Sequence, residues 1–307
     1  MGWVDRQLPE SDEIFLDHVG FFVHDIESIA TAFERLGFAI TPVNIHYAAD
    51  AEGRLVKSGT ANRLLTFRRG YLEVLAAVAD TPLADQLKAA LARYAGLHLL
   101  AFAHADAASQ TERLVRAGFA LQSTVRLRRP VQTAQGEQTA RFTVVRVQPG
   151  VFPEGRVQLL THETPELVWF PEYCSHPNRA DALTDILLVS EDAGEKAERF
   201  GRYTACPAVA DEDRWVVSLA RGRMTFAHPR TAARLLPAFS PPSLPYTAAV
   251  AIASADLAAT RRALAERGVR PAADREKRVC IGPEDAAGAH IVFHTPDAGP
   301  VWPLLGG

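Results

Sequence analysis

One stretch of this sequence occurs twice, and the repeat constrains the fold more than any other feature. An apolar strand-like run that contains His18 is followed by apolar residues at helical spacing, and the helical pattern ends at Gly37. About eighty residues later the same order returns, with His98 in the strand and Gly118 after the helix. The histidine and the glycine are 19 residues apart in the first copy (18 to 37) and 20 apart in the second (98 to 118). We therefore predict two copies of one unit, with His18 and His98 in equivalent positions.

Two weaker copies follow in the second half of the chain. Apolar strands are expected at 183–189 and 248–253, each before a helical pattern, and Asp185 and Ala249 stand where the first copies have histidine. In the first two copies, three further strand-like runs follow the helix, and a connecting helix is expected at 82–94. We predict an α+β fold in which four βαβββ units pair into two cup-shaped modules of mixed sheet.

The domain boundary is expected near residue 178, after a segment rich in proline and aromatic residues. Residues 1–178 would hold the two well-kept units. Residues 179–307 would hold the degraded pair, with a structural or substrate-shaping role.

Composition narrows the kinds of partner. The net charge of −3 comes from 33 basic and 36 acidic residues mixed along the chain, so nothing indicates nucleic acid or a membrane surface. The three cysteines are widely spaced, which fits neither a disulfide framework nor a zinc cluster. No apolar run approaches the length of a membrane span, and the first ten residues lack the apolar core of a signal peptide. We expect a cytoplasmic protein that binds a small molecule, either as a monomer or as a homodimer.

Four residues on the expected strands could form a metal site. The first unit places His18 on its first strand and Glu73 on its last, and the second unit places His98 and Gln158 in the corresponding positions. Pseudo-twofold packing of the two units would bring all four onto one concave face. Two imidazoles and a carboxylate on rigid strands suit a divalent transition metal with open positions, and Gln158 would be a weaker neutral ligand. The alternative is that the histidines are hydrogen-bonded core residues.

Four further residues are candidates for binding the substrate. Asn62 and Arg63 follow a glycine turn and could hold a carboxylate or phosphate. His46 could close the mouth of the cup, and His162 lies four residues after Gln158 on the same strand face, as a neighbour of the site or an alternative ligand. The sequence assigns no residue a catalytic role.

The motifs that carry these residues resemble the vicinal oxygen chelate superfamily, which includes glyoxalases, extradiol dioxygenases, and fosfomycin- and bleomycin-resistance proteins. More narrowly, they resemble bacterial glyoxalase-like domain proteins, and the likeness covers residues 14 to about 200. The motifs concerned lie at 16–18, 59–63, 71–73, 164–169 and 176–178.

This resemblance implies a glyoxalase-like fold with the metal between paired units, held by His18, His98, Glu73 and Gln158. The metal would be Fe²⁺, Zn²⁺, Mn²⁺ or Ni²⁺. Many members have glutamate where this chain has Gln158, and the amide removes the second carboxylate that a glyoxalase would use as a base. Two functions are expected: a metal-dependent isomerase, lyase or ring-cleaving dioxygenase acting on a small vicinal-oxygen substrate, or a metal-free binding or sequestering protein of the same fold.

Overall fold

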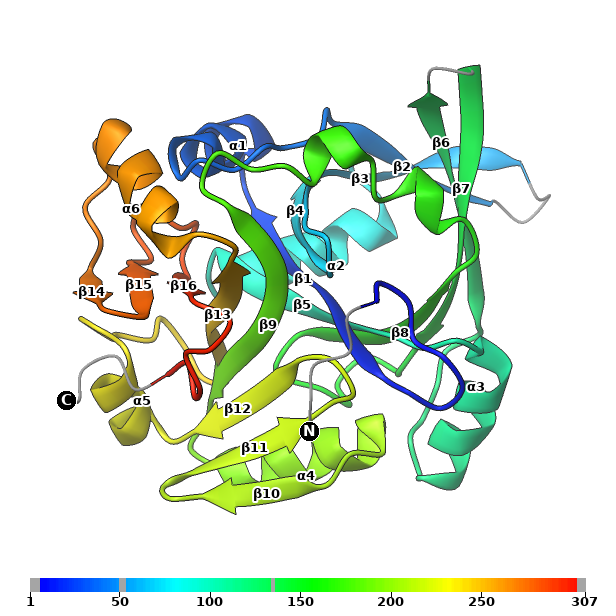
Figure 1. Ribbon diagram of the computed structural model, residues 1–307. Helices are drawn as coiled ribbons and strands as arrows, with labels where there is room; N and C mark the ends of the chain where they lie inside the picture. The colour runs from blue at the N-terminus through cyan, green and yellow to red at the C-terminus, as the bar shows by residue number, and fades with distance from the viewer. Residues whose placement is uncertain (1–5, 50–53, 134–135, 303–307) are drawn as a thin grey trace.

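The computed structural model describes residues 6–49, 54–133 and 136–302. These residues form one mixed sheet of sixteen strands, with helices around it (Figure 1). Four strands lie side by side in the middle of the sheet, in the order β9, β13, β5 and β1. This arrangement of a mixed sheet with separate helices confirms the predicted α+β class.

The strands of the first half are β1 (Phe15–Val23), β2 (Asn44–Ala49), β3 (Leu55–Thr66), β4 (Tyr71–Ala77), β5 (Gly96–Ala103), β6 (Val125–Thr133), β7 (Gly136–Arg146) and β8 (Arg156–His162). Those of the second half are β9 (Ala180–Val189), β10 (Ala208–Asp211), β11 (Arg214–Ser218), β12 (Arg223–Ala227), β13 (Tyr246–Ser254), β14 (Ala273–Arg275), β15 (Arg278–Ile281) and β16 (His290–His294). The α-helices are α1 (Ile26–Arg35), α2 (Pro82–Leu91), α3 (Ala107–Arg116), α4 (Ala193–Thr204), α5 (Pro229–Leu235) and α6 (Leu257–Glu266).

Local sequence signals set the ends of the repeated helices. The side chains of Asp25 and Asp106 accept hydrogen bonds from backbone N–H groups in the first turns of α1 and α3. Gly37 and Gly118 follow the two helices with φ of +84° and +82°, a left-handed conformation that glycine adopts without steric strain. The predicted starts and stops of both helices are confirmed.

The same strand pairing occurs around each of the four central strands. The central strand runs parallel to a strand that follows it in the chain, in the pairs β1–β4, β5–β8, β9–β12 and β13–β16. The central strands themselves pair antiparallel, β1 with β5 and β9 with β13. Asp185 pairs with the first residue of β12, as His18 pairs with the first residue of β4, so Asp185 does occupy the position of His18.

One apolar core joins the two halves of the chain. It contains Phe33 of α1, Phe102 of β5, Phe200 of α4, Phe226 of β12 and Phe293 of β16, all buried. Helices α1, α3, α4 and α6 all contribute to this cluster. Because the core is continuous across residue 178, the two-domain division stays a prediction.

The two cups differ in what fills them. The second is filled by its own chain: Trp302 belongs to the same buried cluster as Leu187 and Val292, and its Nε1 donates a hydrogen bond of 2.9 Å to Thr225 Oγ1. Thr225 pairs with β9 as Glu73 pairs with β1. The first cup remains hollow, and it carries the candidate site.

Some elements differ from the prediction. Strand β6 begins at Val125 instead of residue 119 and continues through Pro130, while β10, β14 and β15 were not expected. The proline-punctuated linker packs on the first unit, where His176 accepts a hydrogen bond from the Ala39 N–H and donates one to Thr66 O. No helix of the described residues is long and apolar enough to cross a membrane.

Candidate functional site

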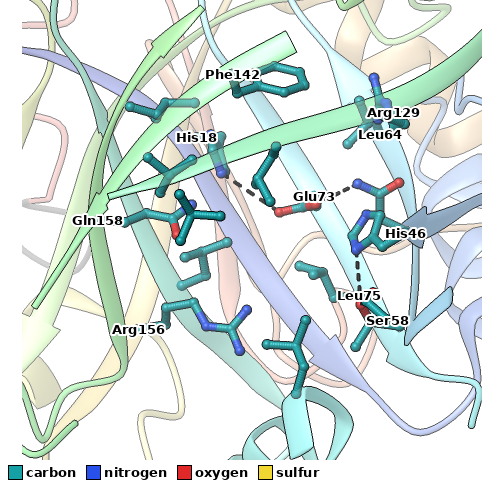
Figure 2. A pocket seen from close by; sticks show the side chains of 18 of the residues that line it. His18, His46, Ser58, Leu64, Glu73, Leu75, Arg129, Phe142, Arg156 and Gln158 are labelled. Carbon is teal, nitrogen blue, oxygen red and sulfur yellow. Dashed lines mark hydrogen bonds and ion pairs between the residues drawn. The ribbon is translucent and has the colours of Figure 1, made fainter. Parts of the chain in front are cut away.

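The first cup encloses a cavity of about 200 Å³ between the strands of the first two units (Figure 2). Its wall is mostly aliphatic, from Leu64, Leu75, Leu99, Leu127, Val144 and Leu160. The polar residues that line it include His18, His46, Asn62, Glu73, Arg129, Arg146, Arg156 and Gln158, and an exposed fourth arginine, Arg128, lies at its edge. A mainly apolar hollow with a few convergent polar groups is typical of a small-molecule site.

Behind the cavity, a buried carboxylate orients one of these groups. Asp17 is fully buried; its Oδ2 lies 2.7 Å from His18 Nδ1, and both its oxygens lie 3.1 Å from His162 Nε2. Although burial acts to raise it, the pKa of Asp17 is held well below its usual value by the two imidazoles, so this group is an anion. An ionised carboxylate only accepts hydrogen bonds, so His18 Nδ1 and His162 Nε2 must both carry hydrogen.

This assignment fixes what His18 presents to the cavity. With hydrogen on Nδ1, the Nε2 of a neutral His18 ring has a free lone pair, and it lies 3.7 Å from Glu73 Oε2 (Figure 2). The Glu73 Oε1 accepts a hydrogen bond of 2.5 Å from Asn62 Nδ2. The His18 ring also stacks on Tyr71, with 4.3 Å between ring centroids, which holds the imidazole plane. The result is an oriented base beside a carboxylate at the cavity wall.

Three guanidinium groups give the cavity positive charge, and two of them, Arg129 and Arg156, lie at opposite ends of it. Arg146 Nε donates a 3.1 Å hydrogen bond to Gln158 Oε1. Arg156 lies over the ring of Phe22 and Arg129 over that of Phe142. Burial lowers the pKa of all three, and for Arg156, which is also close to Arg146, the pKa falls to about 10, so the group is still charged at neutral pH.

The structure does not bring His98 to the cavity, and its predicted equivalence to His18 is wrong by one residue. His98 donates through Nε2 to Tyr94 O at 2.7 Å and lies between the rings of Tyr94 and Phe22. It is the extra residue of a β-bulge, because Gly20 pairs with Leu99 while Phe21 pairs with Leu97. The corresponding bulge residue of β1 is Asp17, since Leu16 pairs with Phe102 and His18 with Ala101.

The residue equivalent to His18 is therefore Leu99. Both pair with the first residue of the parallel strand of their unit, His18 with Tyr71 and Leu99 with Arg156. The sequence carried a signal for this register: Leu99 lies 19 residues before Gly118, the same spacing as His18 to Gly37. The predicted equivalence of Glu73 and Gln158 holds, because these pair with Gly20 and Ala101.

The other predicted residues divide between the cavity and its surroundings. His46 and Asn62 line the cavity, and His46 Nδ1 lies 3.0 Å from Thr60 Oγ1. Arg63 does not line it: the side chain bonds Thr41 O and pairs with Glu27 at 2.6 Å, so its predicted role as a substrate anchor is not supported. His162 also lies outside the lining and bonds Asp17, as a neighbour of the site.

Asp17 and the cavity arginines were missed by reasoning from the sequence alone. A signal was present for one of them, because Arg156 lies two residues before Gln158 on a strand, and alternate residues share a face.

The donor set fits the expected divalent metal poorly. Leu99 stands where a second imidazole was predicted, and the Gln158 oxygen already accepts from Arg146. Across residues 6–49, 54–133 and 136–302, no three His, Cys, Asp or Glu side chains are gathered so as to hold a metal ion. Three guanidinium groups facing a single carboxylate would also repel a dication.

The paired units around one hollow define the vicinal oxygen chelate class of fold. Two solved structures share it over nearly the whole chain. A hypothetical protein from Staphylococcus aureus superposes with a TM-score of 0.60 at 11% identity, covering 92% of this chain and 99% of its own. A mutant of 4-hydroxymandelate synthase from Streptomyces coelicolor gives 0.56 at 15% identity, covering 94% and 95%.

A family model identifies the family to which this chain belongs within that class of fold. The family model described as a glyoxalase-like domain matches residues 16–204, and the chain belongs to this family. No curated protein matches the sequence.

Proposed function

We propose that this protein is an enzyme that moves a proton within a small substrate bearing two neighbouring oxygens, with His18 as the general base. The observation that carries the proposal is the Asp17–His18 pair, 2.7 Å apart, which leaves the Nε2 lone pair of His18 at the cavity wall. A positioned imidazole whose other nitrogen is held by a buried carboxylate suits general acid–base catalysis. The reaction class is isomerisation next to a carbonyl.

The first step would be transfer of a proton from a carbon beside the substrate carbonyl to His18 Nε2. The electrons of that C–H bond form a double bond to the carbonyl carbon, and the carbonyl oxygen becomes an enolate oxyanion. Glu73 Oε2, 3.7 Å from Nε2 before the reaction, then stabilises the imidazolium.

The oxyanion needs hydrogen-bond donors in a site that excludes water. The amide of Gln158 and the free N–H groups of Arg146 line the same cavity and can supply them. Return of the proton from Nε2 to a different atom of the enolate completes the isomerisation and restores neutral His18.

The test is hydrogen exchange in D₂O, followed by proton NMR on a panel of small 2-oxo acids, 2-hydroxy acids and 1,2-dicarbonyl compounds. We expect the protein to accelerate loss of a C–H signal in at least one of them. His18→Gln should reduce the rate at least a hundredfold, because general acid–base catalysis contributes about 10²–10⁴. The matched control is His24→Gln, an exposed histidine just after the same strand, which should leave the rate unchanged.

Metal content of the purified protein, measured by mass spectrometry, separates this proposal from the metal-dependent alternative. Exchange that survives dialysis against EDTA would support it. Exchange that is lost on chelation and restored by Fe²⁺, Zn²⁺, Mn²⁺ or Ni²⁺, or that persists in His18→Gln, would contradict it.

A further inference from the structure

Within the described part of the chain, the partly buried Arg129, Arg146 and Arg156 of the cavity form no ion pair with a carboxylate. Among the described residues, the Arg156 guanidinium makes no hydrogen bond or ion pair, and its Cζ lies over the Phe22 ring, 5.4 Å from the ring centroid. Over residues 6–49, 54–133 and 136–302, Arg146 donates a hydrogen bond only through Nε, and the buried Nε of Arg129 has no partner. Burying unpaired charge is unfavourable, so an arrangement of this kind indicates a missing counter-ion.

The charge balance within the cavity points the same way. Arg129, Arg146 and Arg156 face one carboxylate, Glu73, which is already bonded to Asn62. The other nearby carboxylate, Asp17, is behind His18 and holds two imidazoles. The cavity thus has an excess of positive charge and mostly aliphatic walls.

Two of the three arginines are placed to act together. Arg156 and Gln158 are on the same face of β8, and Arg146 of β7 pairs with Gln158 across the ladder. In Figure 2, the Arg156 guanidinium projects into the hollow from the end opposite Arg129. Guanidinium groups bind carboxylate and phosphate through two parallel hydrogen bonds, and two of them can hold one oxyanion from both sides.

We propose that Arg156 and Arg146 bind an oxyanion of the substrate, a carboxylate or a phosphate, while the apolar part of the substrate contacts the leucine wall around Leu75, Leu99 and Leu160. This inference rests on the proposed function, because it names the substrate class of the same cavity: a small organic anion. It places the charged end of the substrate at β7 and β8 and the reacting carbon next to His18 on β1.

The test is isothermal titration calorimetry with benzoate and phenyl phosphate as oxyanion probes and benzyl alcohol as the neutral probe of similar shape. We expect at least one oxyanion probe to bind at least tenfold more tightly than benzyl alcohol, and to weaken as NaCl is raised. Whichever of the two binds more tightly identifies the carboxylate or the phosphate as the preferred group. Equal affinity for all three probes would overturn the proposal.

Arg156→Met, which keeps an aliphatic stem over Phe22, should raise the Kd of the oxyanion at least tenfold without changing that of benzyl alcohol. Arg156→Lys keeps a positive charge but not the two parallel N–H donors, so its Kd for the oxyanion should lie between those of the natural protein and of Arg156→Met. The matched control is Arg126→Leu, an exposed arginine on β6, which should bind the probes as the natural protein does. An unchanged Kd in a folded Arg156→Met variant would refute the assignment.

The same titration on His18→Gln distinguishes this inference from the proposed function. Oxyanion binding does not need the base, so this variant should bind within about twofold of the natural protein. Tight oxyanion binding by a protein that catalyses no exchange would support the oxyanion site alone, and with it the alternative of a metal-free binding protein. Exchange activity in a protein that binds all three probes equally would refute the oxyanion site and leave the proposed function standing.

Discussion

Replacing Asp17 by asparagine tests the arrangement on which the proposed chemistry depends. The buried carboxylate accepts hydrogen bonds from His18 at 2.7 Å and from His162 at 3.1 Å. Hydrogen bonds to a charged group contribute roughly 1.5–3 kcal/mol each, so the two together contribute about 3–6 kcal/mol. The amide oxygen of asparagine retains one of them, and loss of the charge relieves desolvation. We expect Asp17→Asn to lower the free energy of unfolding by roughly 2–4 kcal/mol at neutral pH.

The pH dependence has a definite sign. Because the pKa of Asp17 is lower in the folded protein than its ordinary value of 3.8, its stabilisation is complete well above pH 4 and is lost as the pH falls. By pH 3 the unfolded chain is largely protonated at this residue while the folded chain is not, a loss of roughly 1 kcal/mol in the natural protein. Asp17→Asn has no such loss, so the stability gap between the two proteins should narrow between pH 6 and pH 3.

The assay is urea unfolding followed by circular dichroism at several pH values. Asp25→Asn is the matched control, since asparagine is about as good an N-cap as aspartate and the change should be below about 0.5 kcal/mol. We also expect Asp17→Asn to reduce exchange activity at least a hundredfold, because the amide can donate to His18 Nδ1 and so favour the tautomer with hydrogen on Nε2. An Asp17→Asn protein as stable as the natural one, with a parallel pH profile, would refute this account of the site.

Two further predictions follow from the corrected register. Leu99→His places an imidazole at the position equivalent to His18, so it should increase the affinity for Co²⁺ at least tenfold, as measured by a titration followed by visible absorption. Because the aliphatic wall loses Leu99, the free energy of unfolding should fall by roughly 2–4 kcal/mol. An unchanged Co²⁺ affinity would show that residue 99 does not face His18 and Glu73. His98→Ala should leave oxyanion binding within about twofold and instead remove a pH effect on folding. Burial lowers the pKa of His98 to about 4 in the folded protein, so its contribution makes stability fall as the pH drops from about 6.5 to about 4, and chemical unfolding over that range should show a smaller decline in the variant; loss of oxyanion binding would place His98 in the site after all.

The sequence alone was sufficient for the repeated strand–helix elements of the first two units, because their determinants are local, whereas the short strands β10, β14 and β15 were not predicted. Asp25 accepts hydrogen bonds from the first backbone N–H groups of α1, and Gly37 ends the helix in a left-handed conformation. Both effects, and the apolar periodicity between them, depend only on neighbouring residues in the sequence. The positions of Asp185 and of Gln158 relative to the first unit were also correct, because they depend on spacing within one unit.

The site depended on strand register. The sequence allowed two alignments of the second unit, through His98 or through Leu99, and the pairing of β5 with β1 decided between them. One extra residue in a strand moves each later side chain to the other face, and the pairing of β5 with β1 absorbs that residue as a bulge at His98. A cavity-facing histidine was thereby predicted where Leu99 stands. Asp17 contacts His162, which lies 145 residues later in the chain, and Arg129, Arg146 and Arg156 come from three different strands. These residues come close enough to interact only when the sheet folds around the cavity.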